Sequence, residues 1–159
     1  MPDFPHVQAL GAVRRRDGDP TVGDPLDPSD ELLVFDGYDG DDLFHRFLGG
    51  TVEFGEHSRE AVVREFREEV GERFVVNGLV GTFERVFEFH GETGHEVWRV
   101  YEGHLDADWP YDRETFTYEE DIPDGEMTAR WVSVADLRAP ETTFHDEAVL
   151  DALSEYATG

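Results

Sequence analysis

The sequence has no cysteine, no lysine and no long apolar run. Without cysteine, disulfides, thiolate zinc sites and cysteine nucleophiles are excluded, and redox chemistry says nothing about the cellular compartment. No apolar stretch approaches the roughly 18 residues that a membrane-spanning helix needs. The first residues also lack the basic and apolar segments of a secretory signal. We therefore expect a cytoplasmic protein that does not bind a membrane.

Acidic side chains dominate the composition. The 38 aspartates and glutamates outnumber the 13 arginines and give a formal net charge of −25. Such self-repulsion destabilises a compact chain in dilute buffer, but at 1 M salt the screening length is only about 3 Å. Aromatic residues make up 13% of the chain and acids occur in every segment, which disfavours a disordered acidic tail. The composition therefore indicates a folded protein from a halophilic organism that accumulates salt.

The same charge limits the partners of the protein. Nucleic-acid polymers are bound through basic surfaces, so binding to DNA or RNA is disfavoured. A small anionic substrate is still acceptable if metal ions neutralise it locally. A homodimer is compatible with the sequence, although no motif requires one.

The pattern of apolar residues predicts an α/β fold. With 159 residues, the chain suits a single domain, residues 1–159, that buries about 70% of its unfolded surface. Strands are predicted at residues 7–13, 31–35, 43–48, 74–89, 96–105 and 129–134. Helices are predicted at residues 58–70, 135–137 and 144–156, and loops at residues 17–30, 36–42 and 106–125. Strands on both sides of a central helix favour a mixed β-sheet with helices on both faces.

The helix predicted at residues 58–70 carries an unusual acidic side. At about 100° per residue, Glu65, Glu68 and Glu69 fall within one turn, next to an apolar face that includes Val62 and Phe66. Like charges at this spacing destabilise a helix by roughly 0.2–0.5 kcal/mol per pair, so a cation is expected to offset them. Hard divalent cations prefer oxygen ligands. Taken alone, the cluster is equally consistent with a solvated acidic face.

The cluster belongs to a longer pattern. Together with the glycines before it, it resembles the Nudix hydrolase signature G-x5-E-x7-R-E-U-x-E-E-x-G-U, in which U is a bulky apolar residue. The matching positions are Gly50, Glu56, Arg64, Glu65, Phe66, Glu68, Glu69 and Gly71. Eight fixed positions within 23 residues make the match specific. Glu72 departs from the last apolar position, where Phe74 can supply the contact, and Leu48 stands where members often have proline.

The resemblance implies a fold and an activity. The fold is the Nudix α/β/α sandwich with a central mixed β-sheet. The activity is Mg²⁺- or Mn²⁺-dependent hydrolysis of the pyrophosphate bond in a nucleoside diphosphate linked to another moiety, so the partner is a small-molecule nucleotide. A catalytically silent Nudix-like module that binds or senses a nucleotide is the alternative, because fold-level analogy does not exclude it. Residues outside the signature do not identify the substrate.

The resemblance also assigns metal ligands. These are Glu65, Glu68 and Glu69 on the helix and the backbone carbonyl of Gly49. Glu56 matches a carboxylate with a structural or metal-binding role.

Catalytic roles follow from the same resemblance. Arg64 matches an arginine that holds the signature glutamates by ion pairing. The general base is open among Glu65, Glu69 and Glu126. Glu126 comes from the region before the last strand, where Glu120 is the second choice.

Substrate contacts are predicted near the glycine turn and in the first strand. Gly50 lies in the turn, and Arg46 lies just before it. Arg14 opens a run of three arginines, whose planar guanidinium groups suit phosphates and bases. Pairing of that run with Asp17, Asp19 and other surface acids is the favoured alternative.

Three residues are given structural roles. Ser58 is predicted to cap the N-terminus of the helix through its hydroxyl, and Gly71 to end the helix in a left-handed conformation. Trp98 is predicted to lie in the core rather than to stack on a base.

The charge generates a first prediction. Because salt screens the repulsion among the acidic side chains, the melting temperature should rise steeply between dilute buffer and molar KCl. Thermal denaturation followed by circular dichroism over a KCl series measures it. A flat response would remove the halophile interpretation.

Overall fold

The computed structural model describes residues 4–39, 41–89, 91–119, 126–144 and 147–158. Its strands are β1 (His6–Arg16), β2 (Asp19–Thr21), β3 (Glu31–Asp39), β4 (Asp42–Thr51), β5 (Phe74–Phe89), β6 (Glu92–Leu105), β7 (Thr115–Glu119) and β8 (Glu126–Ser133). Its helices are α1 (Ser58–Glu69), the 3-10 helix η1 (Trp109–Asp112), α2 (Val134–Leu137) and α3 (Glu147–Thr158). In this described part of the chain, no helix combines the length and apolar character needed to cross a membrane.

The strands form one mixed sheet. Their order is β5-β6-β1-β4-β3-β8-β7, with β2 paired to β1. β1 and β6 run parallel, and the other pairs run antiparallel. The predicted α/β fold with a central mixed sheet is therefore confirmed. β4 changes partner along its length: its first part pairs with β3, whereas Gly49 and Gly50 pair with β1.

The predicted strands and helices are present, but several are longer than predicted. The turn predicted at residues 36–42 is too long, because β3 continues to Asp39 and β4 already begins at Asp42. The loop predicted at residues 106–125 is wrong in its first part, where η1 and β7 form, and residues 120–125 lie outside the described residues. β7 pairs with β8 at the end of the strand order of the described sheet. Because this pairing with β8 stabilises the strand, its own local sequence gives only a weak signal.

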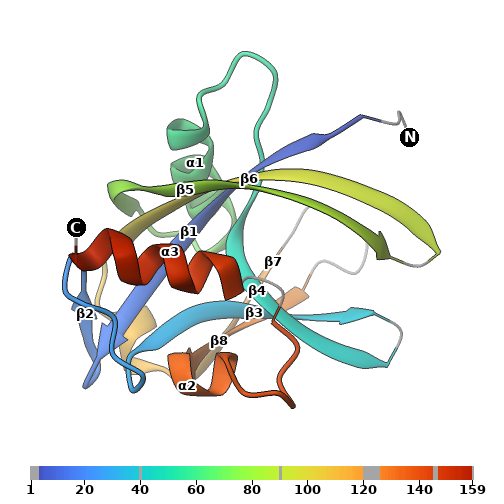
Figure 1. Cartoon of the computed structure of the whole chain (residues 1–159). Helices are drawn as coiled ribbons and strands as arrows, with labels where there is room; N and C mark the ends of the chain where they lie inside the picture. The colour runs from blue at the N-terminus through green and yellow to red at the C-terminus, as the bar shows by residue number, and fades with distance from the viewer. Residues whose placement is uncertain (1–3, 40, 90, 120–125, 145–146, 159) are drawn as a thin grey trace.

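Helices cover both faces of the sheet (Figure 1). On one face α1 buries Ala61, Val62 and Phe66. The Phe66 ring stacks on Phe74 with 4.7 Å between ring centroids. Phe74 is completely buried, so it supplies the apolar contact that Glu72 does not.

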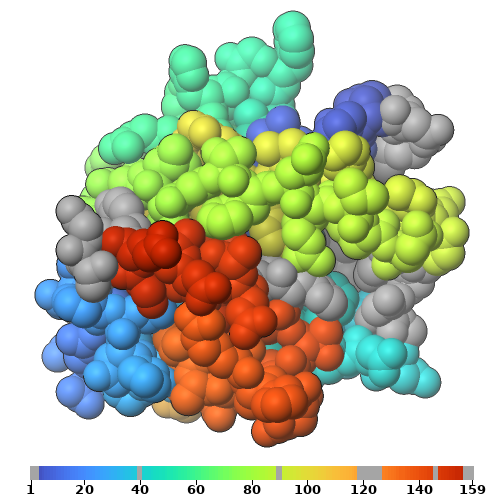
Figure 2. Space-filling view, viewed as in Figure 1, coloured from blue at the N-terminus to red at the C-terminus, as the bar shows by residue number. Residues whose placement is uncertain are grey.

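On the other face α3 covers a second core. Val149, Leu150 and Leu153 pack there with Trp98 and Val100. Figure 2 shows α3 lying across the front of the molecule, below the strand β5. Trp98 is 4% exposed, which confirms its predicted place in the core.

Buried charges connect β1 to its neighbours on this side. Arg14, Asp30 and Glu102 are at most 1% exposed. Arg14 donates hydrogen bonds to Asp30 at 3.2 Å and to Glu102 at 3.1 Å. Arg16 adds a bond to Asp30 at 2.6 Å, and Asn77 adds one to Glu102 at 3.0 Å. Each carboxylate therefore has several donors, as burial requires.

This environment corrects both sequence interpretations of Arg14. The side chain does not reach the surface, so a substrate contact is not supported. Its partners are also not the nearby Asp17 and Asp19, but Asp30 and Glu102. Asp30 directly precedes β3 and meets Arg14 only because β3 folds back beside β1. No local sequence pattern reveals this contact.

Replacing Arg14 with methionine removes the shared partner of two buried carboxylates. We expect the free energy of unfolding to fall by about 3–5 kcal/mol, because each carboxylate loses a donor inside the protein. The matched control is Arg138→Met, since Arg138 pairs with Asp151 at the surface (3.1 Å, side chains 34% and 68% exposed). The control should lose less than about 1 kcal/mol. Urea denaturation in molar KCl compares them, and equal losses would contradict a special role of burial.

Candidate active site

Two glycines bring β4 close to its neighbours. Gly49 has φ = 146°, and a side chain there would collide with the carbonyl oxygen of Ala9. A side chain at Gly50 would overlap the carboxyl group of Glu65. Only glycine therefore fits at Gly49, whereas at Gly50 the backbone of β4 lies directly against the Glu65 carboxyl group of α1.

The ends of α1 are formed differently from each other. The N-cap is His57, which makes no side-chain capping bond, so the prediction that Ser58 caps the helix is wrong. The Ser58 hydroxyl instead lies 2.6 Å from the Tyr101 hydroxyl. At the other end Gly71 has φ = 83°, and its N–H donates to the carbonyl of Phe66, as predicted for a left-handed terminus.

Arg64 lies at the centre of the candidate site. Its Nε and Nη2 donate to the two oxygens of Glu56 at 2.8 and 3.0 Å. Nη2 also donates to the carbonyl of Thr51, at the end of β4 (3.0 Å). Nη1 donates to Glu65 at 3.0 Å and to Glu68 at 3.2 Å. One guanidinium thus gathers three carboxylates and a backbone oxygen.

The bonds between Arg64 and Glu56 keep both of these groups ionised. Hydrogen bonds from Arg64 lower the pKa of Glu56, and the bonds to Glu56 raise the pKa of Arg64 further above its ordinary value. Glu56 also accepts a bond from the N–H of Glu53 at 3.1 Å. Both oxygens of Glu56 are therefore already occupied by donors.

The donor set suits a hard divalent cation. Glu65 and Glu68 each give one oxygen to Nη1 of Arg64, so the second oxygen of each carboxylate is the candidate cation ligand. Glu65 is 16% exposed and Glu68 53% exposed, which leaves the pair accessible. Glu69, on the next position of α1, is half-buried. In the described residues, no three acidic or histidine side chains are already arranged around a common point.

The structure does not bring every predicted residue into this group. Glu126 is the first residue of β8, but its side chain lies outside the described part, as does the whole of Glu120. Arg46, on β4, makes its contacts with residues other than those of the Arg64 cluster. Its guanidinium lies over the rings of Phe35 and Trp98, 5.7 and 5.4 Å from their centroids.

The sequence assigned no functional role to two residues near Arg46. Glu96 lies 3.7 Å from Arg46, and Arg85 lies over the ring of Trp98 at 5.1 Å. Arg85 and Glu96 are directly opposite in the β5–β6 register. The strands predicted at residues 74–89 and 96–105 do not give this pairing, because the turn sets the register and in the structure Phe89 pairs with Glu92.

Solved structures with the same fold are known. A Nudix hydrolase from Nitrosomonas europaea superposes with a TM-score of 0.62 at 19% identity, covering 98% of this chain and 90% of that one. A MutT Nudix hydrolase from Burkholderia pseudomallei gives 0.60 at 22% identity, covering 95% and 97%. The MutT protein from Methanosarcina mazei gives 0.60 at 19% identity, covering 99% and 97%. At these identities the likeness concerns the fold.

The sequence itself matches a family. No curated protein matches it significantly. The NUDIX domain family matches residues 20–153, a range that contains the whole signature and most of the chain. The chain therefore belongs to the Nudix hydrolase family.

Proposed function

We propose that the protein hydrolyses the pyrophosphate bond of a nucleoside diphosphate linked to another moiety, with Mg²⁺ or Mn²⁺ as cofactor. One observation carries the proposal. Arg64 holds Glu65 and Glu68 together directly beside the glycine backbone at Gly50. This arrangement gathers oxygen ligands for a metal directly against the main chain of β4.

Each residue of the candidate site has a separate role in the proposed hydrolysis. Glu65, Glu68 and Glu69, with the carbonyl of Gly49, would hold the metal, which would neutralise the diphosphate and lower the pKa of a bound water. The attacking water forms a new P–O bond, and the bridging P–O bond breaks. A carboxylate accepts the proton of the water. Arg64 keeps the carboxylates oriented during the reaction.

The general base is a glutamate other than Glu56. Glu56 has a lowered pKa and both its oxygens accept hydrogen bonds, so it is a poor proton acceptor and a poor metal ligand. We assign it to positioning Arg64. Glu65, Glu69 and Glu126 remain the candidates for the base.

We also propose that the enzyme works in a salt-rich cytoplasm. Its net charge of −25 repels an anionic substrate. Molar salt screens that repulsion beyond a few Å, and the bound metal cancels it locally.

The central role of the acidic side of α1 is tested by Glu69→Gln. We expect turnover to fall by roughly 10²–10⁴-fold, because the substitution removes a carboxylate that acts as a ligand or base. The fold should persist, as judged by circular dichroism. The matched control is Glu60→Gln, an acidic residue in the first turn of the same helix but outside the signature. Near-normal turnover of the Glu69 variant would show that this side of α1 is not catalytic.

Metal dependence and substrate class are tested together. In molar KCl, phosphate or nucleoside monophosphate release should stop after chelation and return with Mg²⁺ or Mn²⁺. The panel should include oxidised nucleotides, ADP-ribose, sugar nucleotides, dinucleoside polyphosphates and NADH. Binding of any of these without product release would favour the silent, nucleotide-sensing alternative.

A further inference from the structure

Two hairpins project from the same side of the molecule. Figure 1 shows β3–β4 and β5–β6 extending beyond the helices in the same direction. Their strands carry a set of aromatic and charged residues, which we call the hairpin cluster: Phe35, Arg46, Arg85, Glu96 and Trp98. The cluster includes Arg46, for which the sequence predicts a substrate contact.

Arg46 connects the two hairpins. It pairs with Phe35 across the β3–β4 ladder, and its guanidinium also lies over Trp98 of β6. Nε of Arg46 is buried without a hydrogen-bond partner among the described residues. Oε1 of Glu96 lies 3.7 Å from Nη2 of Arg46, beyond hydrogen-bond distance. The side chain as a whole is 24% exposed.

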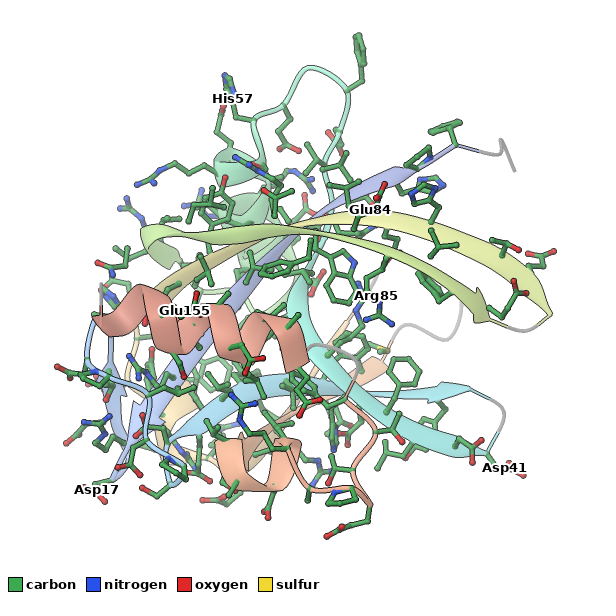
Figure 3. All side chains as sticks on the ribbon, viewed as in Figure 1. Asp17, Asp41, His57, Glu84, Arg85 and Glu155 are labelled. Carbon is green, nitrogen blue, oxygen red and sulfur yellow. The ribbon has the colours of Figure 1, made fainter. Side chains whose placement is uncertain are left out.

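Glu96 and Arg85 complete the charged part of the cluster. Glu96 accepts a hydrogen bond from the indole N–H of Trp98 at 2.8 Å and is 17% exposed. Arg85 stacks on the same indole. Figure 3 shows Arg85 on the side of β5 that faces β4, whereas its neighbour Glu84 lies on the opposite side. The indole thus orients an acceptor, Glu96, close to the donor group of Arg46.

The cluster lies at a useful distance from the candidate metal ligands. Arg46 precedes Gly49 by three residues on the same extended strand, which corresponds to about 10 Å. A substrate whose diphosphate lies at Gly50 and the α1 glutamates would therefore present its next chemical group to Arg46.

We propose that the hairpin cluster binds the nucleobase of the substrate, with Arg46 and Glu96 as the specificity-determining pair. The inference rests on the proposed function. It adds that the nucleobase is the part of the substrate that is recognised, and it names the residues that recognise it. The buried ring of Trp98 orients the guanidinium groups of Arg46 and Arg85, and a planar guanidinium group favours a flat aromatic ligand. A donor beside an acceptor fits the edge of a base, where acceptor and donor atoms alternate. A second phosphate or carboxylate is disfavoured, because Glu96 would repel it.

Binding of analogues that are not hydrolysed provides the test. The probes are the α,β-methylene diphosphates of adenosine, guanosine, cytidine and uridine, and ribose methylenediphosphonate as the base-free counterpart. Titration calorimetry in molar KCl with Mg²⁺ is compared for the wild type, Arg46→Met and Arg46→Lys. Arg138→Met is the control for a lost positive charge away from the cluster, and circular dichroism checks the fold of each variant.

The wild type should bind at least one base-containing analogue about tenfold or more tightly than the base-free one. Arg46→Met and Arg46→Lys should both remove this advantage, because lysine keeps the charge but lacks the planar fork, and neither should change base-free binding. Glu96→Gln should alter the order of preference among the four bases. Equal losses for base-containing and base-free probes, rescue by lysine, or an unchanged preference would overturn the inference. Failure of the proposed function is seen separately, as the absence of phosphate release from natural diphosphates.

Discussion

The candidate site depends on the ion pair between Arg64 and Glu56. Arg64 belongs to α1 and Glu56 to the loop before it, so their two hydrogen bonds clamp the loop onto the helix. The bond from Arg64 to Thr51 fixes the same guanidinium to the end of β4. Three segments meet at one planar group, and the orientation of Glu65 and Glu68 follows from it. A lysine, with a single point charge, offers no such fork.

Arginine serves a related purpose elsewhere in this acidic protein. Arg14 binds two buried carboxylates, and Arg15 bonds to Glu31, Glu114 and two backbone carbonyls while its guanidinium lies over Trp131. Arg14 thereby satisfies carboxylates that burial would otherwise leave unpaired, whereas Arg15 is itself buried and bonds to carboxylates that are 31% and 81% exposed. The buried arginines thus bring several acids into the fold.

The proposed functions of the two regions require different properties. The proposed metal-binding side of α1 needs carboxylates held at fixed positions, and Arg64 holds Glu65 and Glu68. The hairpin cluster needs flat surfaces with a few directed polar groups, which stacking on Trp98 provides. β4 contributes to both, because it carries Arg46 on one part and the two glycines on the next. A substrate that spans both would be aligned along a single strand.

The sequence by itself determined the family, the α1 helix, the main strands and the acidic side of α1, because these follow from local periodicity and from a signature of fixed spacing. It did not determine the partners of Arg14, the replacement of the Ser58 cap by a contact with Tyr101, or the strand β7. Each of these depends on residues distant in the chain, which only the packed sheet brings together. The hairpin cluster is the same case, because Arg46 and Trp98 become neighbours only when β4 and β6 take their places around β1.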